Sequence, residues 1–380
     1  MDFFSAHAIV EGSDVVANAR EAVLEMRRAF TGFPAAILLF FAASERYDPE
    51  TLAAGMQDAF PSARTFGCSS AGEVARGVLL KNAVSAIAFS PEVFENVAIE
   101  AVSGIDADAL AVNKAFSRLE RRLGARMDTL DHRRHFGLAL VDGLANATER
   151  VTERIGELTD VLFTGGCAAD DWRFAKTFVW HGGEVLENGV VLAIMRPRRR
   201  FAVVKTQSVS PAGPARIATR VDPVRRVVFE LDGRPALDVY SETIGIAADR
   251  LTPAVFAENP LCLILDGEPF VRDIAAPEET GLRLFCSPIE GLGYHIARVR
   301  DLMPDTAAVL EARRREFGGI AAVVNVNCAH RDLIIRQNGQ EKAFGALFSD
   351  FPCAGFASYG EIFVGLVNLT STMIVFAAEG

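Results

Sequence analysis

The chain has 380 residues, half of them hydrophobic and 23% charged, so it can form large cores and is not a disordered protein. Lys and Arg number 39 against 49 Asp and Glu, and the net charge of -10 disfavours binding to nucleic acid or to an anionic membrane surface. The sequence has no membrane-length apolar run and no secretory pattern, and its six cysteines form no C-x-x-C pair. We therefore expect a cytoplasmic protein that binds neither nucleic acid nor membrane.

Helical and extended patterns alternate along the chain, which is typical of an α/β protein with mixed sheets and flanking helices. Apolar residues at helical spacing predict helices at 14–30, 48–60, 106–123, 149–157, 236–244 and 305–317. Short apolar runs predict strands at 36–41, 83–89, 97–102, 136–141, 161–163, 177–180, 190–195, 201–206, 261–265, 282–286, 321–326, 362–367 and 372–376. The proline- and glycine-rich segment 208–223 has the composition of a linker. We expect one domain at 1–207 and a second at 224–380.

Three glycine-containing segments resemble one another. The segment 67–74, GCSSAGEV, aligns without a gap with 355–362, GFASYGEI, and 166–171, GCAADD, is a third relative. Apolar strands end in Asp-Gly twice, at Asp142 and Asp266. These matches indicate two related domains that arose by internal duplication.

Each of these segments is predicted to be a turn, and two of them follow an extended run. Backbone N–H groups and the hydroxyls of Ser69 and Ser70 are able to hold a carboxylate or phosphate there. Glu73 and Glu361 are able to accept hydrogen bonds from an amine of a ligand. In the alternative, the small residues only allow tight packing and each Glu bonds the backbone of its own turn. The sequence leaves both interpretations open.

A second group of polar residues follows the apolar strand at 323–327, in the order Cys328-Ala329-His330-Arg331. Polar side chains at the end of such a strand stand where ligands bind in α/β proteins. Arg331 is suited to bind a carboxylate through two parallel hydrogen bonds. In the alternative, it pairs with a structural Asp or Glu.

These motifs together resemble the FIST family, whose members have an N-terminal and a C-terminal FIST domain. The resemblance rests on FGCSSAGEV (66–74), LVDGL (140–144), TGGCAADDWRF (164–174), VVLAIM (190–195), NVNCAHR (325–331) and DFPCAGFASYGEI (350–362). It implies a bacterial cytoplasmic sensory module that binds a small ligand, with amino acids as the usual proposal. His330 departs from the small residue that many relatives have at this position.

The resemblance and the motifs together predict a protein that binds an amino-acid-like metabolite. No segment remains for a kinase or cyclic-di-GMP domain, so we expect the signal to pass to a separate histidine kinase or cyclic-di-GMP enzyme. The predicted ligand-binding residues are Cys68, Ser69, Ser70, Glu73, Asp142, Cys167, Asp170, Asp171, Cys328, Arg331, Tyr359 and Glu361.

Two other functions are alternatives. Some bacterial relatives resemble haem-binding nitric-oxide sensors, and in that case haem b would be the cofactor, with His181 or His330 as its iron ligand. A Cys-dependent enzyme would pair Cys68 or Cys328 with one of the same histidines. Because no convincing catalytic arrangement is present, and no metal-ligand spacing either, we expect neither an enzyme nor a metal protein.

Overall fold

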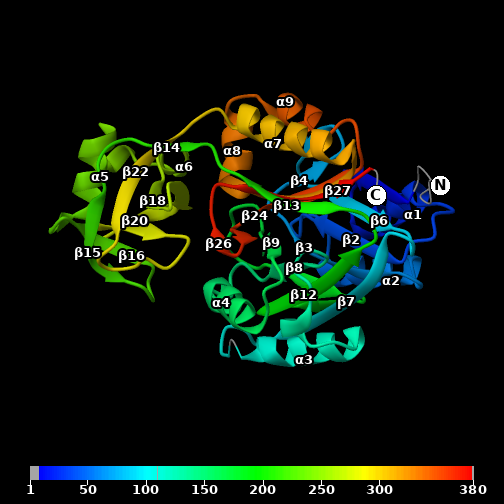
Figure 1. Cartoon of the computed structure of the whole chain (residues 1–380). Helices are drawn as coiled ribbons and strands as arrows, with labels where there is room; N and C mark the ends of the chain where they lie inside the picture. The colour runs from blue at the N-terminus through cyan, green and yellow to red at the C-terminus, as the bar shows by residue number, and fades with distance from the viewer. Residues whose placement is uncertain (1–7, 109, 379–380) are drawn as a thin grey trace.

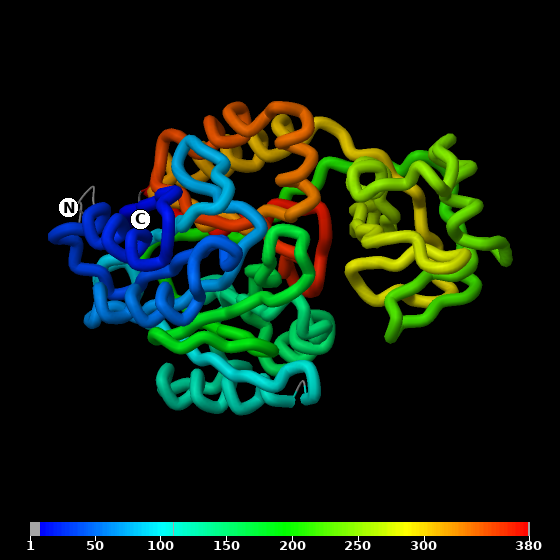
Figure 2. Tube along the Cα trace, turned by 180° about the vertical axis from the view of Figure 1, so that it is seen from behind, coloured from blue at the N-terminus to red at the C-terminus, as the bar shows by residue number. Residues whose placement is uncertain are grey.

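The computed structural model describes residues 8–108 and 110–378, which form a large body and a smaller lobe (Figure 1). The lobe comprises residues 209–299, and the rest of the described chain forms the body. Two crossings of the chain join them, as the view from behind also shows (Figure 2). The crossings run from β13 (Phe201–Thr206) to β14 (Val209–Pro211) and from β22 (Gly293–Val299) to α7 (Leu302–Phe317).

Three six-stranded sheets of the same topology make up the body, each with one parallel strand pair at its centre. The first sheet consists of β1 (Ile9–Asp14), β6 (Val84–Phe89), β2 (Ile37–Ala42), β3 (Arg64–Ser69), β10 (Val179–His181) and β11 (Glu184–Leu186). The second consists of β7 (Phe94–Ser103), β12 (Gly189–Pro197), β8 (Phe136–Val141), β9 (Phe163–Cys167), β25 (Glu361–Phe363) and β26 (Gly365–Val367). The third consists of β13, β27 (Ser371–Ala377), β23 (Ile320–Cys328), β24 (Cys353–Ser358), β4 (Glu73–Ala75) and β5 (Val78–Leu80).

Each sheet is completed by a hairpin that the chain forms after leaving a different sheet. The hairpin β4–β5 follows β3 of the first sheet but pairs with β24 of the third. In the same way β25–β26 follows β24 and pairs with β9, and β10–β11 follows β9 and pairs with β3. The sequence predicts a repetition in the form of two related domains. In the body the repeated unit occurs three times, and the three units interlock through their hairpins.

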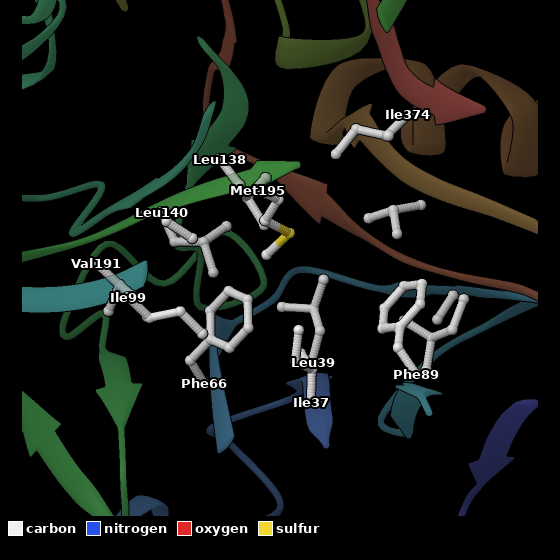
Figure 3. Close-up of a cluster of buried hydrophobic side chains, with 14 of the residues drawn as sticks. Ile37, Leu39, Phe66, Phe89, Ile99, Leu138, Leu140, Val191, Met195 and Ile374 are labelled. Atoms are coloured by element: carbon white, nitrogen blue, oxygen red, sulfur yellow. The ribbon is translucent and has the colours of Figure 1, made fainter. Parts of the chain in front are cut away.

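Helices cover the outer faces of the sheets, and the inner faces pack on one another. The inner core contains stacked Phe41 and Phe356, whose ring centroids lie 4.6 Å apart, and part of this core is drawn in Figure 3. The helices are α1 (Ala19–Ala29) and α2 (Pro49–Ala59) on the first sheet, α3 (Ala111–Leu123) and α4 (Thr148–Leu158) on the second, and α7, α8 (Ala329–Gln337) and α9 (Glu341–Ala346) on the third. A 3₁₀ turn at Met127–Thr129 follows α3.

The lobe contains a nine-stranded sheet with its own apolar core. Its strands are β14, β15 (Arg216–Asp222), β16 (Val227–Leu231), β17 (Arg234–Pro235), β18 (Leu261–Leu265), β19 (Glu268–Arg272), β20 (Ile274–Glu278), β21 (Gly281–Leu284) and β22. Its helices are α5 (Ala236–Ile244), α6 (Pro253–Glu258) and a 3₁₀ turn at Ala248–Arg250. The predicted α/β class with mixed sheets and flanking helices is confirmed.

The segment expected to be a linker, 208–223, contains strands β14 and β15, which both pair with β22. Pro211 ends the edge strand β14, a position where the missing N–H of proline is tolerated. The expected second domain, 224–380, is divided in space, because its strands up to β22 belong to the lobe whereas β23, β24 and β27 belong to the body. Composition alone could not separate an edge strand from a linker here.

A glycine occupies the same place in the central strand pair of each body sheet. A Cβ atom added to any of the three would lie 2.0 Å or less from a carbonyl oxygen of the neighbouring parallel strand. The pairs are Gly67 with Phe40, Gly165 with Ala139 and Gly355 with Asn325.

The Gly355→Ala variant should lower the free energy of unfolding by about 3 kcal/mol, because the added methyl group forces the two strands apart. Urea unfolding measures this change. The matched control is Gly156→Ala in α4, where nothing lies within 4 Å of the added Cβ, and it should stabilise the helix by up to about 1 kcal/mol. Equal effects of the two substitutions would contradict the role given to Gly355.

Candidate functional site

The three glycine turns predicted from the sequence meet at one place in the body. The N–H of Ala71 donates to the carbonyl of Ala357 at 3.0 Å, and the N–H of Ala169 donates to the carbonyl of Ser69 at 3.0 Å. The N–H of Cys167 donates to the carbonyl of Gly360 at 2.8 Å. Because backbone contacts this close leave room only for small side chains, the centre is filled by alanines and covered by Trp172 and Tyr359.

Two predicted site residues, Glu73 and Glu361, are fully buried, and each bonds the backbone just before the strand that follows its hairpin, which is β6 of the first sheet for Glu73 and β27 of the third for Glu361. Glu73 accepts hydrogen bonds from the Ser70 hydroxyl and from the N–H of Ala83 at 3.0 Å. Glu361 accepts from the N–H and hydroxyl of Thr370 at 3.1 and 2.8 Å. Burial raises the pKa of each carboxyl to about 8. These contacts resemble the alternative in which each Glu satisfies protein groups instead of a ligand, although the backbone donors lie beyond the hairpin and not in the turn itself.

Asp142, which follows β8 of the second sheet, also bonds the backbone just before a later strand. It accepts hydrogen bonds from the N–H of Asn188 at 2.6 Å, just before β12, and from the Thr177 hydroxyl. Ser69 accepts a hydrogen bond from the N–H of Phe178 at 3.0 Å. The thiols of Cys68 and Cys328 are buried, and burial raises the pKa of both. These residues face the interior of the body rather than an opening.

Asp170 organises the loop that follows β9. Its carboxylate accepts hydrogen bonds from the N–H groups of Phe174, Ala175 and Lys176 at 2.6–2.9 Å and from the Tyr359 hydroxyl at 2.6 Å. Within this loop Trp172 and Phe174 have positive φ angles of 69° and 51°, which bulky residues rarely adopt. The carboxylate thus holds a strained loop in place, and strain of this kind clusters at functional sites.

A cavity of about 370 Å³ lies between this loop and the lobe. From the body it is lined by Thr148, Cys167, Phe174 and Tyr359 among others, and from the lobe by Arg225, Arg226, Arg283 and Phe285 among others. None of the described residues that line it is acidic. Its size and its mixture of apolar and charged groups are those of a small-molecule site.

Of the residues predicted to bind ligand, only Cys167 and Tyr359 line this cavity. Asp170 bonds Tyr359 beside it, Asp171 forms an ion pair with Lys81, and Arg331 is buried beneath α7. The sequence did not reveal the three arginines of the lobe, because an adjacent pair and a single arginine carry no local signal of a binding site.

The lobe is fastened to the body by charged groups at the rim of the cavity. Glu149, in the first turn of α4, accepts hydrogen bonds from Arg226 Nη2 at 2.8 Å and from the N–H of Ser287 at 2.9 Å. Arg226 Nη1 also donates to the carbonyl of Phe285 at 2.6 Å. One carboxylate of the body is therefore bound by two groups of the lobe.

A second fastening is the buried pair of His330 and Asp273, with Nδ1 and Oδ2 2.6 Å apart. The His330 ring stacks on Trp172, with centroids 4.8 Å apart. His181, the other predicted haem ligand, lies in β10, and burial lowers its pKa. Neither imidazole lines the cavity, so the residues around it do not fit an iron-bound haem.

The chemistry of the remaining groups is limited by burial. Burial raises the pKa of the cavity thiol, Cys167, to about 12, which keeps it protonated at neutral pH. Among the described residues no cluster of three His, Cys, Asp or Glu side chains is arranged to hold a metal ion. None of the described helices combines the length and apolar character needed to cross a membrane.

Two protein-family models match the sequence of this chain. The FIST N domain model matches residues 36–234, and the FIST C domain model matches residues 236–364. The chain belongs to the FIST family. FIST domains are sensory, ligand-binding modules of signalling proteins, so the resemblance inferred from the motifs is confirmed.

The proteins to which this FIST protein is similar include one relative by sequence and one solved structure. The uncharacterized protein MJ1623 of Methanocaldococcus jannaschii is 25% identical over 193 residues, which are 50% of this chain and 37% of that protein. The crystal structure of a cyanuric acid hydrolase from A. caulinodans aligns with 98% of this chain and 99% of its own, with 9% identity and a TM-score of 0.40. The expectation that the chain is not an enzyme is contradicted by this comparison, in which the aligned structure is a hydrolase.

The raised pKa of Glu73 and Glu361 predicts how stability depends on pH. Between about pH 4.5 and about pH 8 the folded protein holds protons on these carboxyls that the unfolded chain releases. The free energy of unfolding should therefore be highest at the acidic end of this window. It should fall as pH rises, by about 1.4 kcal/mol per pH unit for each group. Urea unfolding across the window measures this slope.

Replacing both residues by Gln, which resembles the protonated carboxyl, should flatten the profile. The exposed Glu153, changed to Gln, is the control and should leave the slope unchanged. A wild-type protein whose stability rises over the same window would show that both carboxylates are ionised in the fold.

The Glu149→Ala variant should loosen the lobe, because it removes the acceptor for both Arg226 and Ser287. Loss of these charge-assisted hydrogen bonds should speed amide exchange at β16 and β21 about tenfold or more, as followed by hydrogen–deuterium exchange. Glu153→Ala, on the exposed side of the same helix, should not change it. Equal amide exchange rates in the two variants would contradict the role of Glu149 in holding the lobe on the body.

Proposed function

We propose that this protein is a cytoplasmic sensor that binds a small carboxylate-bearing metabolite of amino-acid type between the body and the lobe. The cavity lining carries the proposal, since it combines three guanidinium groups with apolar and aromatic side chains and contains no described acidic residue. Guanidinium groups are the usual partners of a carboxylate. Six free thiols suit a reducing compartment.

The guanidinium groups are held in position by glutamates outside the lining. Arg225 donates to Glu278 at 2.6 Å, and Arg226 donates to Glu149 at 2.8 Å. Arg283 has a longer contact with Glu278, 3.5 Å, and is half exposed. Arg283 therefore gives up the weakest interaction of the three arginines when its guanidinium group turns to a ligand.

The signal would be a change in how the lobe sits on the body. Two chain crossings connect them, together with polar contacts such as Glu149 with Arg226. Apolar packing connects them too, since Ala257 and Val271 of the lobe share a cluster with Ile334 of α8. A ligand carboxylate at Arg226 competes with Glu149 for the same donor, and so weakens the fastening. The altered surface would be read by a separate partner, such as a histidine kinase or a cyclic-di-GMP enzyme.

The test is isothermal titration of the purified protein with the twenty common amino acids. At least one should bind, and Arg283→Gln should weaken it about 10- to 100-fold, as expected for a lost hydrogen bond to a charged group. Arg234→Gln is the control, because Arg234 pairs with Glu242 outside the cavity. Binding that is the same in both variants would place the ligand elsewhere, and no binding by any amino acid would contradict the ligand class.

A further inference from the structure

A buried polar cluster lies under the helices that cover the third sheet, apart from the cavity. Thr206, Ser371 and Asn327 are neighbours in one row across strands β13, β27 and β23, so their side chains share a face of the sheet. Asn325 lies two residues before Asn327 and therefore on the same face. All of these side chains are buried.

Arg331 extends from α8 into this cluster. Its Nε donates to Asn327 Oδ1 at 3.0 Å, and its Nη2 donates to Thr306 Oγ1 of α7 at 3.0 Å. The side chain has no exposed surface, and burial lowers its pKa to about 10, so it stays charged at neutral pH. In the part of the chain that the structure describes, no carboxylate lies within ion-pair distance of Arg331.

The cluster leaves several buried polar atoms of the described residues without a hydrogen-bond partner. They are Arg331 Nη1, Asn327 Nδ2, Asn325 Nδ2 and Thr206 Oγ1. Each of these atoms carries a hydrogen that it can donate. Buried polar atoms are almost always paired, and a buried charge needs a counter-charge. Glu361 and Asp305 act on Arg331 through space but accept no hydrogen bond from it, so the set of donors favours a further acceptor that carries negative charge.

We propose that this cluster is a binding site for a small inorganic anion of halide size, between the third sheet and helices α7 and α8. Arg331 stands in the first turn of α8, where the positive end of the helix dipole also favours an anion. A water molecule would satisfy the donors but not the charge. The complete burial of these side chains favours a small anion over a larger organic one.

The site has a distinct place in the architecture. Thr206 is the last residue of β13, from which the chain crosses to the lobe, and Thr306 lies in the first turns of α7, where the chain returns. Through Arg331, a bound anion would connect the end of β13 with the first turns of α7, which are the two body segments next to the crossings. It would do so whether or not a metabolite occupies the cavity.

Crystals of the full chain grown with bromide in place of chloride test the proposal directly. The expected result is an anomalous bromide peak within hydrogen-bond distance of Arg331 Nη1 and Asn327 Nδ2. Electron density for water alone at this place, with no anomalous signal, would overturn the proposal. This experiment needs no variant and does not depend on the metabolite.

Thermal unfolding gives a second test in solution. Replacing gluconate by chloride at constant ionic strength should raise the Tm of the wild-type protein. The Tm of Arg331→Met should not respond, and this variant should fold, since apolar residues commonly replace a buried charge without loss of stability. Arg315→Met, at an exposed position of α7, should keep the response. A wild-type Tm that does not depend on chloride would also overturn the proposal.

Discussion

The direct backbone contact of the three glycine turns is the constraint on which the rest of the body depends. Strands whose main chains approach this closely carry small residues at the meeting point, namely glycine, alanine, serine and cysteine. The buried acids nearby must then satisfy local donors, as Glu73 and Glu361 do. The centre is consequently closed, and space for a ligand appears only at its rim, beside Cys167 and Tyr359.

The rim is where the lobe meets the body, and both partners contribute rigid parts to it. Asp170 fixes the aromatic loop through several main-chain hydrogen bonds, so that Phe174 packs against Phe285 of the lobe. Around this aromatic contact the fastenings are polar, namely the ion pair of Glu149 with Arg226 and the short contact of His330 with Asp273. A rigid apolar contact with polar fastenings at its edges allows two defined arrangements better than a uniformly apolar interface does.

Much of the fold could be predicted from the sequence, because strand and helix periodicities are local properties. Helix α5 begins and ends where the pattern predicted it, whereas α1 begins at Ala19 instead of near residue 14, since β1 takes up the residues before it. The glycine similarity was informative too, although the structure aligns Gly165 rather than Gly166 with Gly67. The exchange of hairpins was not predictable, because periodicity identifies a strand but not its partner. For the same reason the cavity, formed by residues distant in sequence, was found only in part.

The exchanged hairpins also determine when each sheet can form during synthesis. The third sheet combines β4 and β5, made early, with β23, β24 and β27, made after the lobe. Until those strands emerge, the buried faces of β4 and β5 have no sheet to join, whereas the strands of the lobe follow one another in the chain and can pair at once. The lobe can therefore fold before the last strands of the body have been synthesised. Contacts of such long sequence separation are slow to form and leave strand edges open to aggregation in the meantime.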